Sequence, residues 1–573
     1  MIRRLLLVLP SAALLLCATP AVLGATTTAS TGATTLYAYA AGGATSPTSC
    51  PESATASLQC TLAVALSLAK AGDTVALATP GKAGHYVGTW SVDTSGTSSS
   101  APLTVKPAPG VTNPVLDGNH GKPAGCQTKA CNGPVLTIGS KVHVDIYGLT
   151  IQNGNNTSDL YGGAINNLAG GTLSVSACTF SKNTAMDGGA IDNADNHGTG
   201  SLAVSSSTFT ANSATGTDTG TDDGGAIDNA DNGGKGILTV SDSTFTANTA
   251  GYGSGVTANT IVDGGAIDSA DNNGTGTLTV SHSTFVDNSA KGGGGAIDNA
   301  DNKVTGTATL AVSASTFSGN TADYAGALND GASTGTVLAS LFSGNSADYG
   351  GAINDSENGT LSVSATTFSH NSANAEGGAS NNGNVVTNFT GTLSVSASTF
   401  SANSVVGNSK APGVDTEYPI GYGGAINNDL TGTLSVSNST FSANTAKNGG
   451  GTMYNRHLLW AAGDIFNGPC NEAAGATWND EGYNVGADAS CLKAGTGDVS
   501  HGANNLGLLA HNGGPTETML PLTDSPAFAV VPLNTNVKLN GRSVKLCPTI
   551  DQRGVHSAAG KACNAGAVQS PAP

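Results

Sequence analysis

The chain has 573 residues, of which 80 are glycine and only 10% are charged, and its formal net charge is -18. Glycine is about twice as frequent as in an average protein, and charged residues are less than half as frequent. A transmembrane bundle is excluded because only one long apolar stretch occurs, and collagen because glycine does not recur at every third position. The composition is typical of a repeat array.

The N-terminus has the features of a secretory signal. Two arginines precede an apolar run over residues 5–16, and small residues follow at Val22 and Gly24. We therefore expect a signal peptide over 1–24 and an exported protein. The apolar run is too short to span a bilayer. A lipid anchor on Cys17 is a second interpretation, disfavoured by the bulky leucine before it.

The segment between the signal peptide and the repeats is expected to cover the first coil of the array. We assign this N-terminal cap to residues 25–100. Within it, residues 62–71 alternate alanine and leucine and end near a lysine, which predicts a helix. The repeats are assigned to 101–466, and a C-terminal cap to 467–573.

Two short motifs alternate along the repeats. Phe-x-x-Asn has its phenylalanine at Phe180, Phe209, Phe245, Phe285, Phe317, Phe342, Phe368, Phe400 and Phe441. Gly-Gly-Ala-Ile, or a variant of it, begins at Gly162, Gly188, Gly224, Gly264, Gly294, Gly350, Gly377 and Gly423. The shortest spacing between successive phenylalanines is 25 residues, which sets the length of one coil.

The segment before each phenylalanine has the pattern of a strand. Leu393 and Val395 alternate with serines, so one face is apolar and the other polar. Phe400 has the opposite parity to Val395, so the chain must bend between them for both to point inward. The asparagine of Phe-x-x-Asn is expected to bond to the same residue one coil above, and the paired glycines to supply a second bend. The prediction is an all-β, right-handed parallel β-helix of the pectin-lyase-like type.

These motifs resemble known families. Gly-Gly-Ala-Ile with Phe-x-x-Asn looks like the repeats of chlamydial polymorphic outer membrane proteins, and residues 150–154 resemble the entry coil of such proteins. Residues 60–66 resemble the CSLREA motif, although that motif has Arg and Glu at positions 63 and 64. Residues 506–518, Asp551-Gln-Arg-Gly554 and Cys563-Asn-Ala-Gly-Ala567 resemble the choice-of-anchor Q domain. The resemblance implies a secreted or cell-surface bacterial β-helix protein and says little about activity.

Four consecutive coils carry acidic residues at the same two repeat positions. The first predicted column is Asp192, Asp228, Asp268 and Asp298, and the second is Asp195, Asp231, Asp271 and Asp301. Stacked carboxylates about 4.8 Å apart repel each other. A Ca²⁺ ion would relieve this repulsion, since calcium prefers carboxylate and amide oxygens. The other interpretation, which we favour, is a solvated acidic stripe or a set of turn-capping aspartates, copied by duplication.

Three insertions interrupt the spacing between the asparagine and the glycine pair. They span 213–223, 249–263 and 404–422, and all leave the coil at the same point. They are therefore expected to project from one side of the shaft. Insertions on one face often mark a binding face, and neutral drift in tolerant loops explains them equally well.

Evidence for catalysis is weak in the sequence. No arginine occurs between Gln152 and Asn455, although β-helix lyases need a lysine or arginine base. Asp222-Asp223 lies in an insertion, and Arg456 is expected to serve a capping role. The histidines at 197, 282 and 370 occupy different repeat positions and show no metal-ligand spacing.

Eight cysteines lie in close sequence pairs outside the segment that carries the two repeat motifs. In an exported chain these pairs predict short-loop disulfides. The pairs are Cys50 with Cys60, Cys126 with Cys131, Cys470 with Cys491, and Cys547 with Cys563. Cys178 occupies a repeat position that elsewhere holds serine, so we expect a packed free thiol.

The expected function is a non-catalytic adhesion, binding or structural role at the cell surface or outside the cell. Partners would be a polysaccharide or another cell-surface ligand, and no nucleic acid, because no basic patch appears. No transmembrane segment is expected after the signal peptide. The alternative is a carbohydrate-active β-helix enzyme, a lyase or hydrolase that acts on acidic polysaccharide. Calcium is the one cofactor that the sequence suggests.

Overall fold

The structure is a computed structural model that describes most of the chain. The described residues are 33–40, 50, 60–78, 84–118, 133–194, 198–215, 223–230, 233–251, 262–270, 273–299, 308–355, 358–383, 390–408, 420–500, 504–557 and 560–569. The predicted signal peptide, Cys126 and Cys131, and the second acidic column at Asp195, Asp231, Asp271 and Asp301 lie outside these residues.

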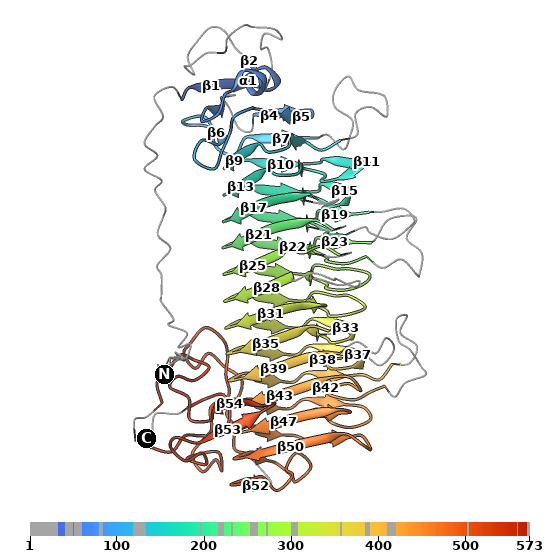
Figure 1. Cartoon of the computed structure of the whole chain (residues 1–573), viewed down its shortest axis with the longest axis vertical. Coiled ribbons are helices and arrows are strands. Elements are labelled where there is room, and N and C mark those ends of the chain that lie inside the picture. Colours follow the sequence, from blue (N-terminus) through green and yellow to red (C-terminus); the bar gives the residue numbers. More distant parts are fainter. Residues whose placement is uncertain are drawn as a thin grey trace, which may run out of the picture.

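The described residues form a right-handed parallel β-helix, as predicted. Three long parallel sheets run the length of one shaft (Figure 1). Each coil passes once through sheet A, sheet B and sheet C in that order. The strands of the shaft begin before residue 101 and continue beyond residue 466, so regular coils extend past the repeats at both ends.

Sheet A has 16 strands and carries the Leu-x-Val segments. In spatial order its strands are β2 (Cys60–Thr61), β1 (Thr35–Tyr39), β3 (Thr74–Leu77), β6 (Leu103–Pro107), β9 (His143–Tyr147), β13 (Thr172–Ser176), β17 (Thr199–Ser205), β21 (Lys235–Ser241), β25 (Thr277–Ser281), β28 (Ala308–Ser313), β31 (Ser333–Leu338), β35 (Thr360–Ser364), β39 (Thr392–Ser396), β43 (Thr433–Ser437), β47 (Leu458–Ala462) and β50 (Thr477–Gly482).

Sheet B has 15 strands and carries the phenylalanines. Its strands are β4 (His85–Val87), β7 (Val115–Asp117), β10 (Thr150–Gln152), β14 (Thr179–Ser181), β18 (Thr208–Thr210), β22 (Thr244–Thr246), β26 (Thr284–Val286), β29 (Thr316–Ser318), β32 (Leu341–Ser343), β36 (Thr367–Ser369), β40 (Thr399–Ser401), β44 (Thr440–Ser442), β48 (Ile465–Asn467), β51 (Val485–Gly486) and β52 (Val499–Ser500).

Sheet C has 13 strands and follows the glycine pairs. Its strands are β5 (Trp90–Val92), β8 (Leu136–Ile138), β12 (Ile165–Asn167), β16 (Ile191–Asn193), β20 (Ile227–Asn229), β24 (Ile267–Ser269), β27 (Ile297–Asn299), β30 (Leu328–Asp330), β34 (Ile353–Asp355), β38 (Ser380–Asn382), β42 (Ile426–Asn428), β46 (Met453–Asn455) and β49 (Asn471–Glu472).

Two short strips of strands lie between sheets B and C. The first contains β11 (Asn155–Tyr161), β15 (Thr184–Asp187), β19 (Ser213–Ala214) and β23 (Thr249–Ala250). The second contains β33 (Ser346–Tyr349), β37 (Ser372–Glu376), β41 (Ser404–Val405) and β45 (Thr445–Ala446). Single bridges through Ser289 and Thr321 join the two strips into one row.

Stacked phenylalanines and asparagines fill the interior. Rings from Phe180 to Phe342 stack with centroids 4.6–4.8 Å apart. The asparagines form the predicted ladder: Asn248 Nδ2 donates to Asn288 Oδ1 (2.9 Å) and to the carbonyl of Phe209 (3.1 Å). Because no coil can satisfy these side chains alone, stacking of coils is what stabilises the fold.

A short helix closes the N-terminal end. Helix α1 (Leu62–Leu68) is shorter than the expected 62–71, and Thr61 caps it by accepting from the amide of Val64. Its Leu62 and Leu66 are buried in the same core as the sheets and cover the edge of the first coil. An uncovered coil end would expose apolar side chains and unpaired backbone groups.

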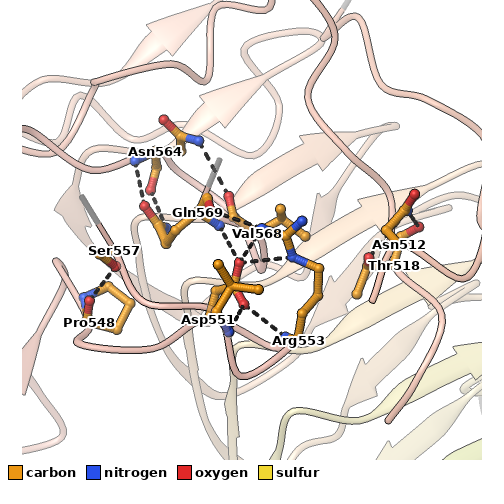
Figure 2. Close-up of polar contacts among 10 residues, drawn as sticks. Asn512, Thr518, Pro548, Asp551, Arg553, Ser557, Asn564, Val568 and Gln569 are labelled. Carbon is orange, nitrogen blue, oxygen red and sulfur yellow. Dashed lines mark hydrogen bonds and ion pairs between the residues drawn. The ribbon is translucent and has the colours of Figure 1, made fainter. Parts of the chain in front are cut away.

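The C-terminal segment over 504–569 runs back along the side of the shaft and packs on sheet B. The carboxamide of Gln552 accepts from Thr399 (2.6 Å) and donates to Thr367 (2.9 Å), so it bridges two coils. Figure 2 shows the ion pair that holds this segment, in which Arg553 Nη2 donates to the buried Asp551 carboxylate (2.7 Å). The hairpin of β53 (Asn536–Leu539) and β54 (Arg542–Lys545) packs beside β47 and β50.

The described cysteines behave as expected. Disulfides join Cys50 to Cys60, Cys470 to Cys491, and Cys547 to Cys563. Cys178 is a free, buried thiol, and its burial raises its pKa to about 11. A thiol with so high a pKa is a poor nucleophile at neutral pH.

Candidate functional site

Each glycine pair makes one edge of the shaft. Gly188 has a φ of 58°, a left-handed conformation that favours glycine, and it turns the chain into β16. A Cβ on Gly189 would collide with the Gly225 carbonyl in the next coil. The glycines thus allow successive coils to approach closely, as the sequence predicted.

Two columns of side chains face each other along this edge. The outer column is the residue before each glycine pair, and the inner column is the second residue of each sheet C strand. From the N-terminal end the outer column is Tyr161, Asp187, Asp223, Asp263, Gly293, Tyr324, Tyr349, Glu376, Tyr422 and Gly449. The inner column is Asn166, Asp192, Asp228, Asp268, Asp298, Asn329, Asn354, Asn381, Asn427 and Tyr454.

The columns are in contact where their side chains are long enough. Asn427 Nδ2 donates to Glu376 Oε2 (3.0 Å), and the rings of Tyr422 and Tyr454 stack with centroids 4.3 Å apart. The edge therefore has two parts: an acidic half in the N-terminal coils and a tyrosine–amide half in the C-terminal coils. The acidic half comprises Asp187, Asp223 and Asp263 of the outer column and Asp192, Asp228, Asp268 and Asp298 of the inner column, and the tyrosine–amide half comprises the members of both columns from Tyr324 and Asn329 onward.

The acidic half contains the first predicted aspartate column in the expected register. Asp192, Asp228, Asp268 and Asp298 lie opposite one another on adjacent strands. All four are buried, with at most 4% exposed, so this column is not a solvated stripe. Asp223 and Asp263 of the outer column are also buried, and their place beside the ladder is not evident from the repeat motifs.

The described residues provide no complete metal site. Within the parts of the chain that the structure describes, no three His, Cys, Asp or Glu side chains meet in an arrangement that could hold a metal ion. One coil contributes one carboxylate to the described inner column, whereas the predicted calcium ladder also uses Asp195 and its equivalents. Calcium binding there stays a prediction.

The tyrosine–amide half is a row of rings beside a row of carboxamides. Tyr324 and Tyr349 stack with centroids 5.5 Å apart, and Tyr324 is 42% exposed. Next to them Asn354 donates to Asn329 (2.9 Å), and Asn381 donates to Asn354 (3.0 Å). Tyr324 therefore offers an exposed ring face, whereas the asparagine side chains, at most 4% exposed, are buried and bond to one another along the edge.

Two carboxylates lie beside these rings. Burial and the nearby charge of Asp348 raise the pKa of Asp323 to about 6, although Lys291 opposes the rise. Burial also raises the pKa of Asp348, whose carboxylate accepts from Asn374 (2.6 Å). Neither residue was singled out from the sequence, because each has acidic neighbours only in the folded coil.

A buried ion-pair cluster lies further along the same edge. Arg456 Nη1 is 2.7 Å from Asp429 Oδ1 and 3.5 Å from Glu376 Oε1. Burial and then the charge of Asp429 raise the pKa of Glu376 to about 8, against the influence of Arg456 and Asn427. Arg456 is therefore an internal ion-pair partner, which is more specific than the capping role expected for it.

The three insertions meet the shaft at this edge. Their described flanks include Asp223, Asp263 and Tyr422, which belong to the outer column itself. The loops therefore leave the coil on one side, as predicted. His282 and His370 lie instead at other turns of the coil, and both have a left-handed backbone conformation.

Comparisons with known proteins support the assignment of the repeat type. The model of the Chlamydia polymorphic membrane protein repeat matches residues 177–194 and 282–300. No curated protein matches the chain. A solved structure titled "The complex structure of XylC with xylose" is similar with a TM-score of 0.40 and 10% identity, over 89% of this chain and 95% of that chain. Within the described residues, no helix has the length and apolar character of a membrane span.

Proposed function

We propose that the chain is an exported surface or extracellular β-helix protein that binds glycan chains, without cleaving them, along the tyrosine–amide half. The matched repeat comes from a membrane protein family, and disulfides are typical of proteins outside the cytoplasm. Both support an extracytoplasmic location.

The observation that carries the proposal is the Tyr324–Tyr349 stack, in which Tyr324 is 42% exposed and Tyr349 is half-buried. Sugar rings present apolar faces that pack on aromatic rings. One such contact is weak, but a repeated edge allows several sugars of one chain to bind together.

The charge of the edge favours a neutral or basic glycan. The acidic half adjoins the tyrosine–amide half in the same two columns. A polyanionic polysaccharide that extended along both halves would be repelled. This differs from the acidic substrate considered in the enzyme alternative.

Glycoside hydrolysis is the second candidate, and Asp323 with Asp348 favours it. Glycosidases use paired carboxyl groups, and a pKa of about 6 at Asp323 suits a general acid, although burial raises the pKa of Asp348 as well. By contrast, Glu376 and Asp429 are buried and held by Arg456, so they are poorly placed to meet a substrate.

A glycan array scored for retention and for cleavage products tests the proposal. We expect retention of neutral glycans without cleavage, and a loss of at least tenfold in affinity for the Tyr324→Ala/Tyr349→Ala variant. Tyr147→Ala is the matched control, since Tyr147 is exposed at the end of β9 on sheet A. Cleavage abolished by Asp323→Asn would establish the hydrolase instead, and absence of retention would refute glycan binding.

A further inference from the structure

The hairpin of β53 and β54 and the outer face of sheet A form a cavity between them. In Figure 1 the hairpin lies beside β43 and β47, near the C-terminal end of the shaft. The cavity has a volume of about 240 Å³, with strands β39 and β43 as its floor and the tip of the hairpin as its roof. Its lining includes Ser394, Ser435 and Ser437 in the floor, and Leu539, Arg542 and Val544 in the roof.

The cavity exists because side chains of different size share one register row of sheet A. Trp460, Ser435 and Ser394 lie opposite one another on β47, β43 and β39. Trp460 and Val544 both pack against the small apolar core that holds the hairpin, which includes Leu539. Because a serine is much smaller than a tryptophan, a hairpin that rests on the indole stands away from the serines of the next two strands. The gap is therefore fixed by the packing of the hairpin.

Arg542 lies on the side of the hairpin that faces the cavity. It is paired with Leu539 across the hairpin, and Val537 is paired with Val544 two residues further along. Residues two apart on a strand share one face, so all four lie on the same face of the hairpin. Leu539 is buried in the core beside sheet A, so this face is the one that covers the sheet. Lys538 lies on the opposite face, towards solvent.

The arginine of this cavity has no acidic partner. Three arginines occur among the residues that the structure describes, and Arg456 and Arg553 are each 2.7 Å from the oxygen of a buried carboxylate. Arg542 forms no ion pair with any described residue, and the hydroxyls of the three floor serines have no partner among those residues either. A guanidinium binds a carboxylate or a phosphate through two parallel hydrogen bonds, and hydroxyls both donate and accept. Together they are a suitable set of groups for a hydroxylated anion.

The hairpin is basic in an acidic protein. Residues 536–545 contain Lys538, Arg542 and Lys545 and no acidic residue, whereas the whole chain has a net charge of -18. A local excess of positive charge attracts anions and raises their rate of binding. Hydroxyl side chains alone do not mark this place, because the same row continues through Ser362 and Thr336 on the neighbouring strands. The roof and its arginine distinguish it from the rest of sheet A.

We infer that this cavity binds one anionic sugar residue, a saccharide unit that carries a carboxylate or a phosphate group. Arg542 binds the anionic group, the floor serines bond to ring hydroxyls, and the apolar side chains of the roof pack on the ring. Pockets for drug-sized molecules measure about 300–1,000 Å³, so this smaller cavity fits a single sugar ring. An inorganic anion is disfavoured because it would leave the apolar roof uncovered. The site lies on sheet A, away from the tyrosine–amide half, and so goes beyond the proposed function.

Isothermal titration calorimetry with glucuronate and with glucose 6-phosphate tests the inference. Glucose, acetate and inorganic phosphate are the matched ligands, since each lacks either the charge or the ring. Arg542→Gln removes the guanidinium, and its control Lys538→Gln removes a charge from the opposite face of the same hairpin. Ser394→Trp fills the cavity, and its control Ser174→Trp places the same ring on the outer face of β13, in an earlier coil.

We expect one or both anionic sugars to bind at least tenfold more tightly than glucose, acetate and phosphate, and the tighter of the two identifies the anionic group. Arg542→Gln and Ser394→Trp should each weaken binding at least tenfold, and their controls less than twofold, with circular dichroism confirming that each variant is folded. The inference is overturned if neither anionic sugar binds, if acetate or phosphate binds as tightly, or if Lys538→Gln costs as much as Arg542→Gln. Binding here should be unchanged in Tyr324→Ala/Tyr349→Ala, so the two sites fail or succeed separately.

Discussion

Asp330 and Asp355 occupy successive rungs of a ladder that is otherwise built mainly from asparagine. They lie opposite each other on β30 and β34, and both point into the shaft. In neighbouring coils an asparagine Nδ2 donates to the next residue down, as from Asn299 to Asp330 (3.1 Å) and from Asn382 to Asn428 (2.7 Å). A carboxylate cannot donate, but a protonated carboxyl group can replace the amide.

Asp355→Asn should therefore stabilise the protein at neutral pH. Burial, and then the charge of Asp330, raise the pKa of Asp355 well above its usual range, and burial raises that of Asp330 to about 6. For Asp330, a pKa raised from 3.8 to about 6 lowers the free energy of unfolding by about 3 kcal/mol once the pH exceeds the pKa of the folded protein. We expect a higher melting temperature for the variant at pH 7.5 and little difference at pH 4.

The reverse substitution is the control for that prediction. Asn382→Asp places a third carboxyl group in the next rung. It should lower the melting temperature at pH 7.5 by more than at pH 4. Equal effects of both substitutions at the two pH values would contradict a protonated ladder.

Glu376 should make stability fall as the pH rises. Its pKa of about 8 lies above the ordinary value of 4.5, so the folded protein holds a proton that the unfolded chain loses. The contribution of that proton to the free energy of unfolding is fully present below about pH 4.5 and is lost as the pH rises towards 8. Glu376→Gln should therefore raise the melting temperature at pH 8 and leave it nearly unchanged at pH 4.5.

Differential scanning calorimetry from pH 4 to pH 9 checks this. Glu481→Gln on β50 is the matched control, since it makes the same chemical change on the last strand of sheet A. Its melting curve should follow that of the unmodified chain at each pH. A Glu376 variant that melts below the unmodified chain at pH 8 would show that the carboxylate form stabilises Arg456.

The repeat could be predicted because it is local and periodic. Phe285, Asn288 and the glycine pair fall within one coil, and their recurrence alone fixes which residues stack. The turns were only partly predictable: a bend near Ala397 was expected, but nothing in an alanine signals its φ of 45°. Ser206, Asp242 and His282 have the same left-handed conformation at this turn in other coils, so the turn position and not the residue type sets it.

The candidate site was harder to predict because its parts come from different coils. Glu376, Asp429 and Arg456 belong to three successive coils and form one cluster only when these coils stack. The outer column was visible in principle, since its members precede a glycine pair, or Ala325-Gly326 in the case of Tyr324. The residue type in this column changes along the shaft, from Asp187 to Tyr324, so the column does not appear as a repeated residue in the sequence.

Gly189→Ala should destabilise the protein more than a typical glycine substitution. Its φ is not in the left-handed region, but an added Cβ would collide with backbone of the next coil. Gly344→Ala is the matched control, because its surroundings are open and only its φ of 66° opposes a side chain. We expect a loss of about 1 kcal/mol for Gly344→Ala and several times that for Gly189→Ala in urea unfolding. Similar losses would contradict close coil contact at the glycine pairs.

The melting temperature of the protein should depend both on the charge of the aspartate ladder and on calcium. Asp228 and Asp268 are buried on adjacent strands, so their carboxylates repel each other by about 1 kcal/mol even in a water-like medium. In chelator, Asp228→Asn/Asp268→Asn should therefore melt at a higher temperature than the unmodified chain. Millimolar calcium should raise the melting temperature of the unmodified chain and leave the variant unchanged, since the variant lacks two ligand carboxylates. An equal calcium response in both proteins would place the cation elsewhere, and no response in either would remove calcium from the ladder.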